Sequence, residues 1–304
     1  MEAGTRVLVR RSLLVVSPLD DRGLTDAANS VADAIVVDLT SRVPKPQRDD
    51  ARRATPSAVE RLSGSGAELL LWTDPKGVSA DLAACGFEAI TGVVAAVDTP
   101  EEANSIDEAL ATWESANNIP NGTLTMELVL ASAKAVGNVD QLAAASRRIA
   151  AMALDDETLL CEMGVASSGP SDRLLYQRGK MVMSARSAGI QVHALGHIGD
   201  SLVDRAVAAR QAGLRGALCF NSIEALALNT GFSHLIEEIE TARQVLEVMQ
   251  EAVDGGRGAV AVSSGQMADL ANVRGAQAII AWSEAVEARE SLRRQPASSQ
   301  ISLE

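Results

Sequence analysis

Aromatic side chains are nearly absent from the sequence, at 2% of 304 residues. Proteins that bind single-stranded nucleic acid stack the bases on aromatic rings, so this composition argues against such a platform. Basic residues are also in the minority, with 27 Lys and Arg against 40 Asp and Glu and a formal net charge of −13. Because phosphate contacts need a basic face, the sequence predicts no nucleic-acid partner.

Long apolar runs and paired cysteines are lacking as well. No run approaches the about 18 residues that a membrane-spanning helix needs, so we expect no membrane partner. The apolar run at residues 12–16 is too short for a signal sequence, and two acidic residues follow soon after it. The cysteines, Cys85, Cys161 and Cys219, are far apart and odd in number, which predicts neither a disulfide framework nor a metal site. We therefore expect a cytoplasmic protein.

The sequence does contain a series of short apolar runs rich in Val, Ile and Leu. These residue types suit strands, and the lack of polar alternation indicates burial on both faces, as in a parallel sheet covered by helices. The runs lie at residues 13–17, 34–38, 69–72, 90–97, 123–130, 149–154, 191–195 and 216–220. Helical patterns separate most of them, and residues 99–102, Thr-Pro-Glu-Glu, have the cap, proline and acids of a helix start.

This alternation predicts an α/β protein with a (β/α)₈ barrel. A doubly wound open sheet is the alternative, but the first expected strand is not followed by a glycine-rich phosphate turn. Two more helices are expected at residues 233–252 and 269–292. We predict a modified TIM barrel over residues 1–232, extra C-terminal helices over 233–292 that pack on the barrel or on a neighbouring subunit, and a flexible tail over 293–304.

Catalytic side chains of such barrels lie at the carboxyl ends of the strands. Asp38 ends the second run and is either a catalytic carboxylate or the cap of a turn. Glu127 lies inside the fifth run, where an unpaired charge is costly. With a carboxylate of the cluster Asp155-Asp156-Glu157 it predicts a Mg²⁺ site, although Asp155 and Asp156 also suit the cap of the next helix.

Two histidines, His193 and His197, follow in the seventh run and just after it. Their spacing does not suit a zinc pair on a strand, so we interpret both as hydrogen-bonded residues of the rim. Asn221 ends the eighth run and belongs to the same rim.

Six short segments follow one another at residues 11–14, 34–39, 174–178, 185–189, 256–262 and 272–276. In this order and spacing they resemble segments of the citrate lyase β-subunit-like proteins of the HpcH/HpaI aldolase family. The resemblance implies a modified TIM barrel that assembles as a homotrimer or homohexamer. It also implies Mg²⁺-dependent cleavage or formation of carbon–carbon bonds in acyl-CoA thioesters or 2-oxo acids, with the metal stabilising an enolate and an arginine steadying the substrate.

Carried over residue by residue, the resemblance places the family's metal-binding Glu on Glu127 and its metal-binding Asp on Thr158, with Glu157 matching the preceding Glu. The substrate arginine falls near Trp72. Other family positions are also changed: the acidic pair falls on Thr40-Ser41, the Pro-Lys on Ala95-Ala96, the His-Pro on Asn221-Ser222, and the Lys of a late Gly-Lys-Met on Gln266.

Asp155 or Asp156 is available as a substitute for the missing metal ligand, and Arg42 as a cation that reaches the rim. The candidate catalytic residues are therefore Asp38, Glu127 and Arg42, and the candidate metal ligands are Glu127, Asp155 and Glu157. Three hypotheses remain: an active lyase or hydrolase of the family with shifted ligands, a catalytically inactive scaffold that binds a metabolite or a partner subunit, and an unrelated barrel enzyme that uses His193 or His197 as a base.

Self-association is the first testable prediction. Leu235, Ile239 and Leu246 recur near a helical period in the helix after the barrel, and this stripe would otherwise be left in water. We expect sedimentation velocity at micromolar concentration to show a trimer or hexamer. A monomer at that concentration contradicts the prediction.

Overall fold

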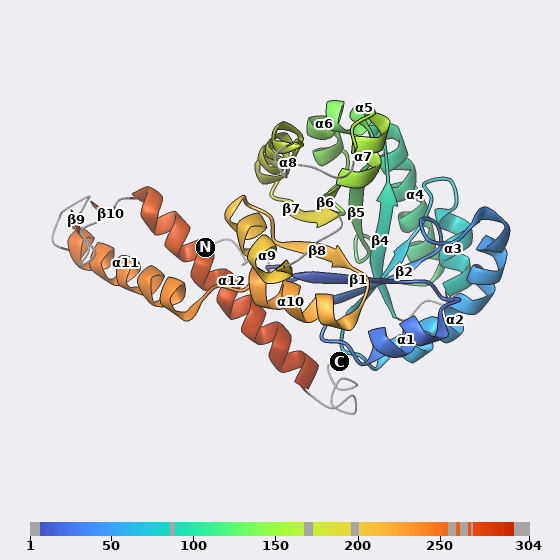
Figure 1. Cartoon of the computed structure of the whole chain (residues 1–304), viewed down its shortest axis with the longest axis horizontal. Helices are drawn as coiled ribbons and strands as arrows, with labels where there is room; N and C mark the ends of the chain where they lie inside the picture. The colour runs from blue at the N-terminus through green and yellow to red at the C-terminus, as the bar shows by residue number, and fades with distance from the viewer. Residues whose placement is uncertain are drawn as a thin grey trace. The chain divides into compact units, whose positions relative to one another are not determined.

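The computed structural model describes residues 7–85, 89–166, 173–195, 201–254, 260–261, 267–268 and 270–294. Within these residues, eight parallel strands close into a barrel in the order β1 to β8 (Figure 1). The strands are β1 (Ser12–Val16), β2 (Ala34–Asp38), β3 (Glu68–Trp72), β4 (Ile90–Ala96), β5 (Thr125–Leu130), β6 (Ile149–Asp155), β7 (Gln191–Leu195) and β8 (Gly216–Cys219). Each predicted strand is confirmed to within two residues at either end.

Helices follow the strands around the outside of the barrel (Figure 1). They are α1 (Asp21–Ala28), α2 (Arg48–Ser63), α3 (Val78–Cys85), α4 (Pro100–Ala116), α5 (Ala133–Gly137), α6 (Val139–Ala143), α7 (Asp156–Glu162), α8 (Leu175–Ser187), α9 (Leu202–Gln211) and α10 (Ser222–Phe232), with a short 3₁₀ helix, η1 (Lys45–Gln47), before α2. The predicted start of α4 is confirmed, because Thr99 and Glu102 form a reciprocal capping box ahead of Pro100.

Pairing of the first and last strands excludes the open sheet. Leu13 lies opposite Leu218 and Leu14 opposite Cys219 in the parallel β1–β8 ladder. No edge strand remains in the barrel once this pair is formed, so alternate side chains of every strand face an enclosed interior.

The two faces of the strands carry different cores. On β5, Met126, Leu128 and Leu130 belong to the large cluster between the strands and the helices. Val129 belongs to a second cluster that fills the barrel interior. Because side chains alternate along a strand, Glu127 faces that interior as well. The interior cluster consists of Leu13, Val15, Ala34, Val36, Leu70, Trp72, Val94, Val129, Ala153 and Leu218.

The chain divides into two compact units, and the division falls after Phe232. One unit is Arg10–Phe232, the barrel with its helices. The other combines the segment through Val9 with the chain from Ser233, so the first residues group with the C-terminal helices and not with the barrel.

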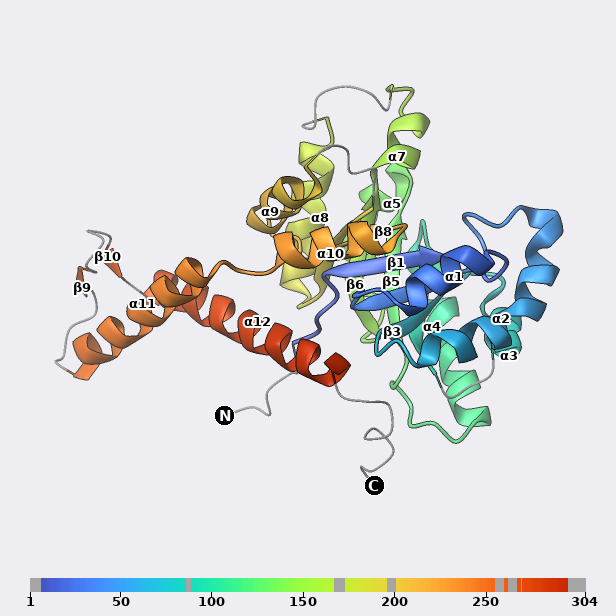
Figure 2. The same cartoon turned by 60° about the horizontal axis from the view of Figure 1, so that its bottom comes forward.

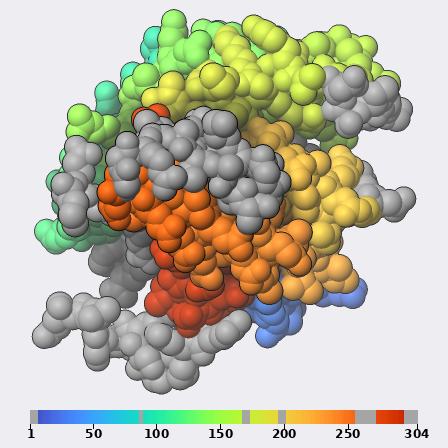
Figure 3. All heavy atoms as spheres, turned by 90° about the vertical axis from the view of Figure 1, so that its left-hand side faces the viewer, coloured from blue at the N-terminus to red at the C-terminus, as the bar shows by residue number. Residues whose placement is uncertain are grey.

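The second unit is built on α11 (Ile236–Asp254) and α12 (Leu270–Arg294), which lie side by side in Figure 2 and appear in orange and red in Figure 3. Val9 packs with Trp282 and Val286 of α12. Two short strands, β9 (Val260–Ala261) and β10 (Met267–Ala268), pair between the helices. Both predicted helices are confirmed, and the predicted tail lies outside the described residues from position 295 onward. The described helices include no candidate for a membrane-spanning segment.

Truncation of a buried leucine between strand and helix tests this packing. Leu128 is 0% exposed, and we expect Leu128→Ala to lower the free energy of unfolding by about 2–5 kcal/mol, because it leaves a cavity. Met183→Ala is the control, since Met183 is 72% exposed and its truncation is expected to change stability by no more than about 0.5 kcal/mol. Urea unfolding measures both. Equal losses in the two variants would contradict the assignment of β5.

Candidate functional site

Asp38 stands at the carboxyl end of β2 and is fully buried. Its carboxylate accepts hydrogen bonds from the backbone N–H groups of Thr40, Ser41 and Arg42 at 2.8–2.9 Å and from the Ser41 hydroxyl at 2.6 Å. These hydrogen bonds are those of a turn cap, one of the two alternatives for this residue. Both carboxylate oxygens are engaged by the following loop.

Arg42, the candidate cation, does reach the rim. Its guanidinium lies over the ring of Phe220, 4.6 Å from the centroid. Phe220 directly follows β8, and β1 lies between β2 and β8 in the barrel. The Arg42–Phe220 pair therefore spans the carboxyl end of β1.

Glu127 does not lie at the rim. It is three residues inside the carboxyl end of β5 and is 0% exposed. Its Oε1 lies 2.8 Å from Nδ1 of His193, and its Oε2 lies 3.8 Å from Nη1 of Arg10. Burial acts to raise the pKa of the Glu127 carboxyl, but His193 and Arg10 together outweigh burial and leave that pKa below its ordinary value.

The other candidate metal ligands are separated from Glu127. In the β5–β6 ladder Glu127 pairs with Ala151, and Asp155 lies four residues further along β6, which is about 13 Å along the strand. Asp155 accepts hydrogen bonds from the backbone N–H and the hydroxyl of Thr158, at 3.0 and 2.7 Å, and so caps α7. Glu157 is exposed on the first turn of that helix.

The predicted magnesium site is therefore not assembled by these residues, because Glu127 is enclosed and Asp155 is used as a helix cap. Across the described part of the chain, no group of three or more His, Cys, Asp or Glu side chains is arranged to hold a metal ion. Asp156, the other substitute, pairs with Arg178, and burial raises the pKa of its carboxyl.

Trp72 occupies the position at which the family resemblance implies a substrate-binding arginine. Trp72 ends β3, faces inward and is 7% exposed. Asn221 caps α10, since its Oδ1 accepts the backbone N–H of Glu224 at 2.9 Å. The described ends of β2, β3, β6 and β8 thus carry side chains that stabilise the loops or fill the core.

A polar group inside the barrel is not expected from the sequence. His193 is expected at the rim, but it is completely buried on β7 against Glu127, and Arg10 enters from the amino end of β1. The sequence does contain a sign of this group, because Glu127 and His193 are titratable residues inside two apolar runs that are expected to be buried strands. His197 lies outside the described residues.

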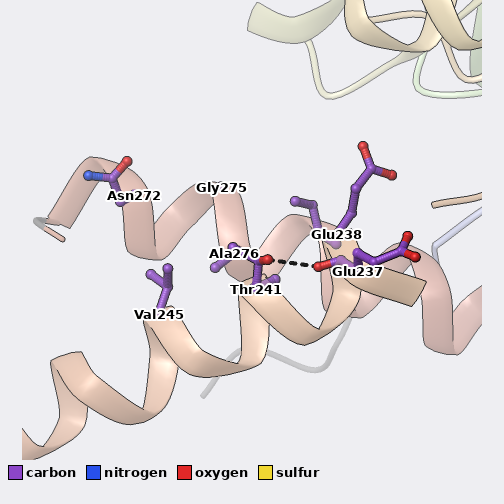
Figure 4. Close-up of a pocket in the computed structure, with 9 residues that line it drawn as sticks. Glu237, Glu238, Thr241, Val245, Asn272, Gly275 and Ala276 are labelled. Carbon is purple, nitrogen blue, oxygen red and sulfur yellow. Dashed lines mark hydrogen bonds between the residues drawn. The ribbon is translucent and has the colours of Figure 1, made fainter. Parts of the chain in front are cut away.

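A groove of about 500 Å³ lies between α11 and α12 (Figure 4). Its lining is mostly small or apolar, with Ala242, Val245, Ala276 and Ile279 among the residues. Two carboxylates, those of Glu237 and Glu238, also line the groove.

The sequence was compared with known protein families, and the match it finds covers the barrel. The model of the HpcH/HpaI aldolase/citrate lyase family matches residues 11–222. The chain therefore belongs to this family of carbon–carbon lyases.

Individual relatives are distant. The citrate lyase subunit beta of Leuconostoc mesenteroides subsp. cremoris is 26% identical over 90% of this chain and 92% of its own length. The L-malyl-CoA/beta-methylmalyl-CoA lyase of Rhodobacter capsulatus is 25% identical over 84% and 89% of the two chains. Among solved structures, one is the protein CitE of Mycobacterium tuberculosis in complex with magnesium, acetoacetate and coenzyme A. Its TM-score is 0.70 at 21% identity, and the match covers 92% of this chain and 100% of that one. The two proteins therefore share a fold.

Acid titration tests the environment of Glu127. Its lowered pKa means that the ionised carboxylate stabilises the folded state above the ordinary Glu pKa of about 4.3, and that this contribution is lost as the pH falls through the lower folded-state value. We expect the stability advantage of wild type over Glu127→Gln to shrink between about pH 6 and pH 3. Glu157→Gln, at an exposed position, is the control and is expected to show a much smaller change. Urea unfolding at each pH measures the difference, and an advantage that is constant with pH contradicts the assignment.

Proposed function

We propose that this protein keeps the barrel of the lyase family but does not perform the family's magnesium-dependent carbon–carbon chemistry. It serves instead as a non-catalytic scaffold, a subunit that binds a metabolite or a protein partner. The observation that carries this proposal is the use of the rim carboxylates: Asp38 caps its own loop and Asp155 caps α7.

Magnesium chemistry supports the same conclusion. Mg²⁺ demands near-octahedral oxygen ligands and gives up its waters reluctantly, so a protein site needs carboxylates that reach a hydrated opening. Glu127 is enclosed and already opposed by His193 and Arg10. Glu157 is the one exposed carboxylate of the predicted set, and it lies on α7 without the second ligand. The residues present do not fit the ion.

The residue at the position of the substrate arginine also supports the loss of the family's lyase activity. A guanidinium binds a carboxylate with two parallel hydrogen bonds, which an indole ring cannot do. Trp72 fills the end of β3 as part of the interior core. Arg42 supplies a cation at another part of the rim, where it is held on Phe220.

The second candidate function is a lyase with shifted ligands, acting on an acyl-CoA or 2-oxo acid. The exposed guanidinium of Arg42 favours it, because this group is positioned to bind an anionic substrate at the carboxyl end of the barrel. This candidate also needs Asp155 to leave its helix cap. The cap contributes about 1 kcal/mol to stability, so a bound metal would have to offset that loss.

A homotrimer or homohexamer in the cytoplasm is part of the proposal. Exposed apolar side chains on α10 and at the start of α11 support self-association. Their exposed fractions include 79% for Ile223, 57% for Leu226 and 72% for Ile236. The three cysteines are free, as expected in a reducing compartment.

Magnesium calorimetry with a cleavage assay tests the proposal. We expect no binding heat at millimolar Mg²⁺ and no cleavage of malyl-CoA or citryl-CoA by the wild type. Thr158→Asp alone is expected to remain inactive, because it places a second carboxylate against Asp155 and leaves Trp72 unable to bind the substrate carboxylate. The variant that combines Thr158→Asp with Trp72→Arg supplies both missing groups and tests whether they suffice for turnover.

The M. tuberculosis protein, which was solved with magnesium, is the positive control for metal binding, and the R. capsulatus lyase is the control for cleavage. Tight Mg²⁺ binding by the wild type that Asp155→Asn abolishes would establish the lyase with shifted ligands and overturn the scaffold.

A further inference from the structure

The interior of the barrel holds a group of three polar side chains, Arg10, Glu127 and His193, within an otherwise apolar core. Arg10 is 1% exposed, and Glu127 and His193 are 0% exposed. Arg10 is anchored at the amino end of the barrel, where its Nε donates to Glu68 at 2.8 Å and its Nη2 to the Thr125 hydroxyl at 3.1 Å. The group therefore lies deep in the barrel, away from the carboxyl-end rim.

One polar atom of each of these three side chains has no hydrogen-bond partner. These atoms are Nη1 of Arg10, Oε2 of Glu127 and Nε2 of His193. Buried polar atoms are hydrogen-bonded in the great majority of folded proteins, because an unpaired one loses its contact with water and gains nothing in return. Arg10 and His193 both lie against Glu127, so an explanation is needed for unpaired atoms on neighbouring side chains.

The separation and the chemistry of the unpaired Arg10 and Glu127 atoms suit a bridging water molecule. Arg10 Nη1 is a donor and Glu127 Oε2 is an acceptor, and the 3.8 Å between them is too long for a direct hydrogen bond. A polar contact longer than about 3.5 Å is the separation at which an intervening water is expected. The carboxylate of Glu127 disfavours an anion, and the guanidinium of Arg10 disfavours a metal ion, so a small neutral molecule that both donates and accepts is the suitable ligand.

The backbone restricts the alternative in which Arg10 moves to close the gap. A Cβ atom at Gly216 would lie 1.9 Å from the carbonyl oxygen of Arg10, so the two strand ends approach as closely as a glycine allows. The side chain is also held at two of its nitrogens by Glu68 and Thr125. Arg10 Nη1 is thus positioned near Glu127 without reaching it.

We propose that the barrel encloses ordered water at the Arg10–Glu127–His193 group. This water accepts a hydrogen bond from Arg10 Nη1 and donates one to Glu127 Oε2. Buried waters occur at on the order of one per 27 residues and make 2–4 hydrogen bonds, so a site with two polar partners falls in the ordinary range. The water is a structural component that lets an ion pair exist inside an apolar barrel.

Oxygen-17 magnetic relaxation dispersion, which counts long-lived internal waters, tests this on the full-length chain. Glu127→Met removes the acceptor at similar length, and we expect the count to fall by at least one. Glu127→Gln retains an acceptor oxygen and is expected to retain the water. Met126→Leu is the matched control, because Met126 is the buried neighbour on β5 that faces the helices, and it should leave the count unchanged.

A crystal structure of the wild type provides a second test that needs no variant to fold. We expect electron density for water within hydrogen-bond distance of Arg10 Nη1 and Glu127 Oε2. A direct hydrogen bond between these two atoms with no density beside them would overturn the proposal. An equal count of long-lived waters in wild type and folded Glu127→Met would overturn it as well.

Discussion

Closure of the parallel sheet is the constraint on which the rest of this structure depends. Once β1 pairs with β8, alternate side chains of eight strands share one enclosed volume, and each must be matched in size and polarity to its neighbours. Leucine, valine and alanine fill most of that volume because large aromatic residues are scarce in the chain. A charge on an inward position has to be balanced inside the barrel, and Glu127 is balanced by His193 and Arg10.

The polarity of this barrel differs between its two ends. Toward the amino end, Arg10, Glu68 and Thr125 form a connected network that continues to Glu127. At the carboxyl end, where TIM-barrel enzymes carry out chemistry, Asp38 accepts hydrogen bonds from its own loop and Asp155 from the first turn of α7. Both carboxylates are thus hydrogen-bonded within the chain, whereas that of Glu157 is exposed.

Much of the fold was predictable because the physics that forms its elements is local. The runs at residues 34–38 and 191–195 contain the branched residues that suit strands, and Thr99-Pro100-Glu101-Glu102 contains a complete helix start. The position of Glu127 relative to the rim was not predictable in this way. Its inward direction follows from alternation, but its depth depends on where β5 ends, and its partners come from β7 and from the residue two positions before β1.

In the candidate site, too, local sequence patterns indicated which residues are polar but not which contacts they make. Sequence left Asp38 as either a catalytic group or a cap, and only the hydrogen bonds from Thr40 to Arg42 distinguish the two. Arg42 was expected near the rim, yet its contact with Phe220 joins two loops about 180 residues apart, a pairing set by barrel closure and by no local pattern.

The helix cap at Asp155 has a consequence for how this protein depends on its surroundings. In a metalloenzyme, loops around the ion commonly draw part of their order from it, so that depletion of divalent cations loosens the active site. Here β6 runs directly into α7, and the junction is held by a carboxylate and a hydroxyl of the same chain. Its conformation is therefore set by contacts that form within the chain as it folds.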